Sequence, residues 1–281
     1  MTPIDVWDAS TLDDELVARL EGNAALLSSY FERDHQIFLS HDLGRGPDRS
    51  ILRPDNIYAA DFLALQTEIA GIMSARVIRA FHYSRLREEE VEGLLANGVR
   101  LSTPQFLQTR LDAAVDANAL TKTDARKLYA ESPFHSDQLE ARSGKFWMAS
   151  HPIAKDDSGV APLLERWGGE VAAMWINDSS LVARLQSLGS PRVVELAVPL
   201  VATRHCWEAG KAVMASFARS RGAIPGKFAF DLYTERDLSA SAILAVHSEN
   251  SASFIGIGKS YPPGFVDVDI GRWKELTGED D

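Results

Sequence analysis

The chain contains a single cysteine, Cys206, and no long hydrophobic run. One cysteine excludes an intrachain disulfide and suits a reducing compartment. The most apolar stretch, Val193 to Ala202, is interrupted by Glu195 and Pro199 and is shorter than the roughly 18 residues that cross a bilayer. The first residues lack the basic and apolar regions of a signal peptide. These features predict a cytoplasmic protein of bacterial type with no membrane partner.

Basic residues are also in short supply. The 281 residues include 29 Lys and Arg against 40 Asp and Glu, which gives a net charge of −11. A general nucleic-acid binder needs a basic surface that displaces condensed counterions, so this class is disfavoured. A local basic strip is the alternative, and its candidates are Arg76, Arg79, Arg85, Arg87 and Arg100.

The strong catalytic motifs are missing as well. The sequence has no complete phosphate-binding loop, no G-x-G-x-x-G after its first predicted strand, no H-E-x-x-H, no cysteine pair for zinc and no G-x-S-x-G elbow. The dipeptide His41-Asp42 resembles part of a metal-dependent hydrolase site, but a lone dipeptide is a weak signal, and a solvated loop is the favoured interpretation. Composition is otherwise ordinary, with 45% hydrophobic and 25% charged residues, and indicates a globular protein.

Hydrophobic periodicity changes near residue 75. Before this point the pattern is helical, with Phe62, Leu65 and Ile69 on one face of a helix over 56–74. After it, strands alternate with short helices, and the late strands have short connections. The predicted strands are 76–85, 145–150, 170–176, 192–200, 228–234, 243–247 and 253–257. The pattern predicts an α+β fold with a mixed, largely antiparallel sheet in a core domain, 76–281, behind a helical N-terminal extension, 1–75.

Helix-capping residues mark several boundaries. Thr11 is expected to cap the first helix, and Thr103 followed by Pro104 is expected to open another. Asn97-Gly98 supplies a left-handed stop for the helix in between.

Chemistry-bearing side chains gather at residues 81–85 of the predicted strand 76–85. Phe81-His82-Tyr83-Ser84-Arg85 combines an imidazole, a phenol, a hydroxyl and a guanidinium. Alternation places His82 and Ser84 on one face and Tyr83 and Arg85 on the other. This arrangement suits a binding site, and a half-exposed strand with outward polar positions is the plainer alternative.

Two later segments also contain unusual groups. The stretch 143–152 places Trp147 beside small polar residues such as Ser150, which suits a flat ligand but also fits a core strand. In the strand 192–199, Glu195 stands among aliphatic residues. A carboxylate in such surroundings usually has a partner or a task, unless it faces solvent.

These three segments, in this order, resemble the skeleton of an ADP-ribosyltransferase domain. In such domains a strand with His leads into a helix and a Gly-containing turn, which Gly98 to Thr103 resembles here. The resemblance implies NAD as the substrate and no metal. It implies that the strand with His82, Tyr83, Ser84 and Arg85 binds NAD, with His82 at the adenosine-side ribose and Tyr83, Arg85 or Ser102 near the pyrophosphate. Trp147 and Ser150 would line the nicotinamide pocket, and Glu195 would be the catalytic carboxylate.

The function expected from this resemblance is transfer of ADP-ribose from NAD to an unknown acceptor, a protein or a nucleic acid, by an enzyme of toxin or phage-defence type. Val193 replaces the Gln or Glu of arginine-modifying members, so an arginine acceptor is not expected. The alternatives are a non-enzymatic protein that binds a ligand or partner and, less favoured, the hydrolase with His41 and Asp42. The transferase hypothesis requires His82, Trp147 and Glu195 to meet in one cleft.

Overall fold

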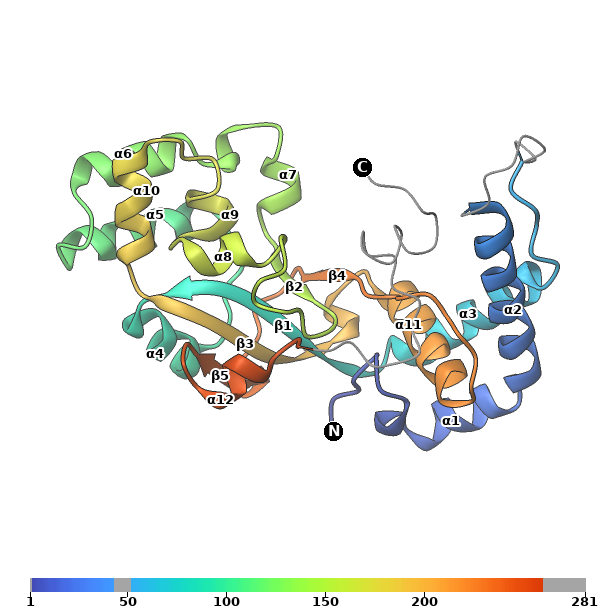
Figure 1. Cartoon of the computed structure of the whole chain (residues 1–281). Helices are drawn as coiled ribbons and strands as arrows, with labels where there is room; N and C mark the ends of the chain where they lie inside the picture. Colours follow the sequence, from blue (N-terminus) through green and yellow to red (C-terminus); the bar gives the residue numbers. More distant parts are fainter. Residues whose placement is uncertain (1, 43–51, 260–281) are drawn as a thin grey trace. The chain divides into compact units, whose positions relative to one another are not determined.

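The computed structural model describes residues 2–42 and 52–259 (Figure 1). The chain forms two compact units, one within residues 1–77 and 205–230 and the other within residues 78–204 and 231–260. The change of pattern near residue 75 therefore coincides with a change of unit. After residue 204 the chain returns to the first unit. The division into 1–75 and 76–281, which has one boundary, does not include this return.

The first unit is helical and combines the N-terminal segment with residues 205–230. Its main helices are α1 (Asp14–Glu21), α2 (Ala24–Ile37), α3 (Ala59–Met73) and α11 (Cys206–Ser220). Helix α3 falls within the helix predicted over residues 56–74, and it buries Phe62, Leu65 and Ile69. The buried Gln66 donates a hydrogen bond to the backbone oxygen of Trp207 at 3.1 Å, which ties α3 to the start of α11.

The first helix begins later than predicted. Asp13, not Thr11, is its N-cap, because the Asp13 carboxylate accepts a hydrogen bond from the Leu16 amide at 3.0 Å. The Thr11 hydroxyl instead donates to the carbonyl of Asp8 at 2.8 Å within a preceding 3₁₀ turn.

The second unit contains a five-stranded sheet in the order β4-β2-β1-β3-β5. The strands are β1 (Val77–Leu86), β2 (Phe146–Ala149), β3 (Ser190–Pro199), β4 (Asp231–Thr234) and β5 (Ile243–Ser248). Neighbours pair in the antiparallel sense, with Phe81 opposite Ala149 and Ala149 opposite Asp231. The predicted α+β class with a largely antiparallel sheet is confirmed.

Helices α5 (Pro104–Asp116), α6 (Lys122–Ala130), α7 (Leu139–Arg142), α8 (Ala161–Glu165), α9 (Gly169–Ala172) and α10 (Ser179–Ser187) lie together on one side of the sheet (Figure 1). Helices α4 (Glu88–Asn97) and α12 (Ala252–Gly256) lie against β5 instead. Leu107, Leu111, Leu128, Trp167 and Leu185 belong to one buried core shared by α5, α6, α9 and α10.

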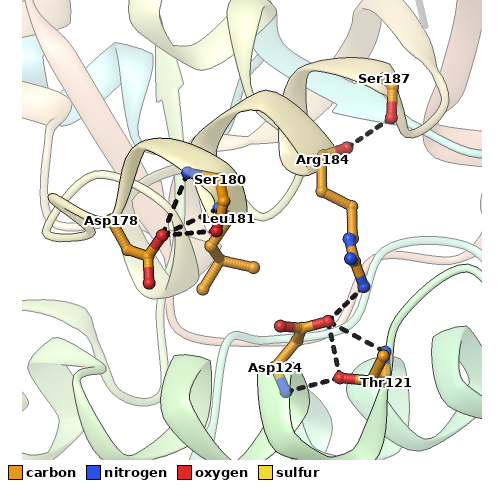
Figure 2. A network of polar contacts seen from close by, with 7 residues as sticks. All are labelled: Thr121, Asp124, Asp178, Ser180, Leu181, Arg184 and Ser187. Atoms are coloured by element: carbon orange, nitrogen blue, oxygen red, sulfur yellow. Dashed lines mark hydrogen bonds and ion pairs between the residues drawn. The ribbon is translucent and has the colours of Figure 1, made fainter.

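Polar contacts fix the ends of α6 and α10 (Figure 2). The Thr121 hydroxyl and the Asp124 carboxylate form a capping box at the start of α6, and Arg184 of α10 donates to the same carboxylate at 2.5 Å. Asp178 caps α10 by accepting from the amides of Ser180 and Leu181. The Lys127 ammonium and these donors hold the pKa of Asp178 well below its usual range.

Two predicted strands are wrong. Residues 170–176 begin with the short helix α9, because Gly168 and Gly169 adopt left-handed φ values and Ala172 packs into the helical core. Residues 253–257 lie largely in α12, whose N-cap is the Ser251 hydroxyl. Within the described residues, no helix is both long enough and apolar enough to span a bilayer.

Candidate functional site

The second unit contains a cavity of about 610 Å³ beside β1 and β2. Its walls come from the two strands, the segment between α4 and α5, the loop that follows β2, helices α5, α7, α8 and α9, and the start of β4. Among the residues singled out from the sequence, His82, Tyr83, Ser84, Ser102 and Trp147 line this cavity. Segments separated by more than 60 residues in the chain therefore meet at one site.

His82 is held on β1 in a defined orientation. Its Nδ1 lies 2.9 Å from the backbone oxygen of Trp147, and its ring lies 4.3 Å from that of Phe146. Burial lowers the pKa of His82 to about 4, an effect that the hydrogen bond to Trp147 opposes and the charge of Arg110 reinforces. The imidazole is therefore neutral near pH 7. Because Nδ1 donates its proton to the carbonyl, Nε2 carries a lone pair that can accept a hydrogen bond.

Tyr83 and Trp147 are anchored by their polar atoms. The Tyr83 hydroxyl donates to the carbonyl of Ile153 at 3.1 Å and accepts from its amide at 2.6 Å, and burial raises the pKa of this phenol. The Trp147 indole donates to the carbonyl of Ala141 at 3.1 Å, and its ring lies 4.7 Å from that of Tyr233. With Phe106 and Phe146, these rings give the cavity flat apolar surfaces suited to an aromatic ligand.

Charged side chains of both signs complete the lining. The cationic ones are Arg100, Arg110, Arg142 and Lys145, and the carboxylates are Asp157, Glu170 and Asp231. None of these seven residues was among the predicted site residues, and Arg100 was a candidate only for the basic strip. Lys145 lies in the segment 143–152 that suits a flat ligand, but the side chains of all seven are ordinary in sequence, and only the tertiary structure brings them to one cavity.

Asp231 differs from the other two carboxylates in its position. It is exposed, it begins β4, and it pairs with Ala149 of β2, the strand that carries Trp147. Glu170 lies in α9, and Asp157 lies in the loop that follows β2. Asp231 is thus the carboxylate that the sheet itself presents to the cavity.

Three predicted site residues are not part of this cavity. Within the described chain, Arg85, Ser150 and Glu195 are not among its lining residues. The Arg85 Nε donates to the carbonyl of Leu188 at 2.8 Å, and Ser150 is completely buried.

Glu195 belongs to a polar cluster of its own. Its Oε1 forms an ion pair with Arg79, and its Oε2 lies 2.9 Å from Nε2 of His247. Neither Glu195 nor Arg79 is among the residues that line the cavity. Glu195 therefore does not meet His82 and Trp147 there.

The candidate basic strip is largely neutralised. Arg76 pairs with Asp13 and Glu15, Arg79 with Glu195, and Arg100 with Asp237 at 2.7 Å. These three arginines form intramolecular ion pairs, so they do not form a continuous basic surface.

No group of three or more His, Cys, Asp or Glu side chains in the described part of the chain is arranged to hold a metal ion. The side chains of His41 and Asp42 lie outside what the structure describes. Comparison of the chain with protein-family models, with curated proteins and with solved structures finds no match. The function must therefore be argued from the site.

Proposed function

We propose that the cavity of the second unit binds NAD and that the protein is an ADP-ribosyltransferase-like enzyme. The observation that carries this proposal is the convergence of His82, Ser102, Trp147 and Asp231 on one cavity. The first three were selected from the sequence for NAD binding, and the fourth supplies a carboxylate beside them.

The cavity offers groups for the parts of such a ligand. The aromatic surfaces around Trp147 suit a nicotinamide or adenine ring. The neutral Nε2 of His82 accepts a hydrogen bond from a ribose hydroxyl. Both roles depend on side chains whose own hydrogen bonds already fix their positions.

Asp231 is proposed as the catalytic carboxylate in place of Glu195. Cleavage of the nicotinamide–ribose bond leaves the electron pair on the nicotinamide nitrogen and develops positive charge on the sugar. A fixed carboxylate stabilises that charge, directly or through the 2′-hydroxyl. An acceptor nucleophile, from a protein, a nucleic acid or water, then bonds to the sugar carbon and loses its proton.

Nicotinamide release tests the activity. Purified protein is incubated with NAD, alone and with cell extract as a source of acceptors, and NAD binding is measured by calorimetry. We expect binding and release. Absence of both overturns the proposal, whereas binding without release under either condition favours the non-enzymatic ligand-binding alternative.

The two candidate carboxylates are separated by a pair of isosteric variants. Asp231→Asn should lower nicotinamide release by about a hundredfold or more, while NAD affinity and thermal midpoint stay near those of the wild type. Glu195→Gln should retain release, because its carboxylate bonds Arg79 and His247 and not the cavity. If Glu195→Gln loses release and Asp231→Asn retains it, Glu195 is the catalytic carboxylate.

A further inference from the structure

Two arginines in the cavity wall have donor groups that no acceptor in the described part of the chain uses. Nη2 of Arg110 and Nε of Arg142 are buried and have no hydrogen-bond partner among the described residues. Unpaired buried donors are costly, and most in folded proteins find a partner. Both side chains line the cavity, so a ligand is the natural source of the missing acceptors.

Arg110 contacts two residues that do not line the cavity, Glu90 and Trp167. Its Nε donates to Oε1 of Glu90 at 2.8 Å, and its guanidinium lies over the ring of Trp167 at 4.9 Å. Glu90 is fixed in turn by the Trp167 indole at 2.7 Å and the Arg87 amide at 2.9 Å. This leaves the two terminal nitrogens of Arg110 for a ligand in a preset orientation. A guanidinium fork matches two oxygens of a phosphate.

Arg142 approaches from another helix. It is the last residue of α7, and its Nη1 pairs with Glu170, which also lines the cavity. That pair uses one side of the guanidinium and leaves Nε. The two arginines thus bring donors from α5 and α7 to one cavity in a protein whose net charge is −11.

We propose that Arg110 and Arg142 form the subsite for the diphosphate of the bound dinucleotide. The identity of that ligand rests on the proposed function, whereas the preference of the subsite for a phosphate does not. The role replaces the one expected for Arg85, whose guanidinium donates to the carbonyl of Leu188 instead. A neutral ligand that filled only the aromatic part of the cavity would leave Nη2 of Arg110 and Nε of Arg142 without acceptors.

Binding of matched ligands tests the subsite. Dissociation constants are measured by calorimetry for ADP-ribose, adenosine and inorganic pyrophosphate. In Arg142→Gln we expect affinity for ADP-ribose to fall about ten- to a hundredfold, the loss typical of a charged hydrogen bond, with adenosine affinity unchanged. Raising the salt concentration should weaken ADP-ribose binding but not adenosine binding.

Two further variants serve as controls for loss of the fold and for loss of an arginine outside the cavity. Arg110→Lys keeps a charge but not the fork, so it should also weaken ADP-ribose binding, and its thermal midpoint reports whether the Glu90 network survives. Arg184→Gln, which removes an ion pair with Asp124 away from the cavity, should bind ADP-ribose as the wild type does.

The outcomes separate the two proposals. If the wild type binds NAD and the folded Arg142 and Arg110 variants bind ADP-ribose unchanged, the diphosphate subsite is overturned and the proposed function stands. If the wild type binds pyrophosphate, less tightly in both variants, but neither binds nor cleaves NAD, the proposed function fails and a phosphate subsite survives. Equal affinity of the wild type for adenosine and ADP-ribose overturns the subsite.

Discussion

At the scale of a single residue, the neutral state of His82 predicts how the free energy of unfolding depends on pH. Its pKa is about 4 in the folded protein, because of burial, and about 6.5 in an unfolded chain. Between these values the unfolded state binds more protons, so the free energy of unfolding falls as pH falls from 6.5 to 4. We expect His82 to contribute a loss of about 1–2 kcal/mol between pH 7 and pH 5.

The variant His82→Asn isolates this contribution. The Asn amide can still donate to the Trp147 carbonyl but does not titrate. Urea unfolding at pH 7 and pH 5 should show a smaller pH dependence in the variant than in the wild type. Equal dependence in both proteins would mean that His82 is protonated near its ordinary pKa and is no neutral acceptor.

Single residues also show where sequence reasoning stops. His82, Ser102 and Trp147 could be selected because local residue types and strand alternation were unusual around them. Arg110 and Asp231 could not, since an arginine on a helix and an aspartate at the start of a strand are ordinary in sequence. Glu195 was selected because its neighbours are apolar, and it proves to be a carboxylate with partners on β1 and β5 rather than in the cavity.

At the scale of an element, the cap of α5 links stability to the site. The Thr103 hydroxyl accepts from the Phe106 amide at 3.0 Å, and Pro104 occupies the first helical position. This helix carries Phe106 and Arg110 to the cavity. Thr103→Ala should lower the free energy of unfolding by about 1 kcal/mol, whereas Thr103→Ser, which keeps the acceptor, should cost less. Chemical denaturation measures both, and equal losses would show that the hydroxyl is not the stabilising group.

Some elements with strong local signals were predicted well, whereas elements that depend on tertiary packing were not. The Thr103 cap and the stop at Gly98, whose φ is +82°, follow from backbone chemistry that neighbouring residues determine. The sequence 170–176 has apolar residues that suit a strand or a helix. Its helical conformation depends on packing of Ala172 and Ala173 into the core with Trp167 and Leu185, which no local pattern reveals.

At the scale of the whole molecule, the first unit needs two distant parts of the chain. Helices α3 and α11 meet closely at Gly210, where an added Cβ would lie 3.1 Å from the Ala70 nitrogen. The change in texture near residue 75 could be predicted because helical periodicity ends there. The assignment of residues 205–230 to the N-terminal helices could not, because it depends on contacts between segments more than 130 residues apart.

This close contact predicts that the two units respond differently to one substitution. Gly210→Val should force α11 from α3 and destabilise the first unit by about 1–3 kcal/mol. Gly71→Val is the matched control, since a Cβ at Gly71 meets nothing within 4 Å and valine suits a helix at least as well as glycine. Hydrogen exchange should accelerate in 2–42, 52–77 and 205–230 of Gly210→Val, with β1 to β5 much less affected. Equal acceleration in both units would show that the chain unfolds as one cooperative body, so that its two units are a division of contacts and not of stability.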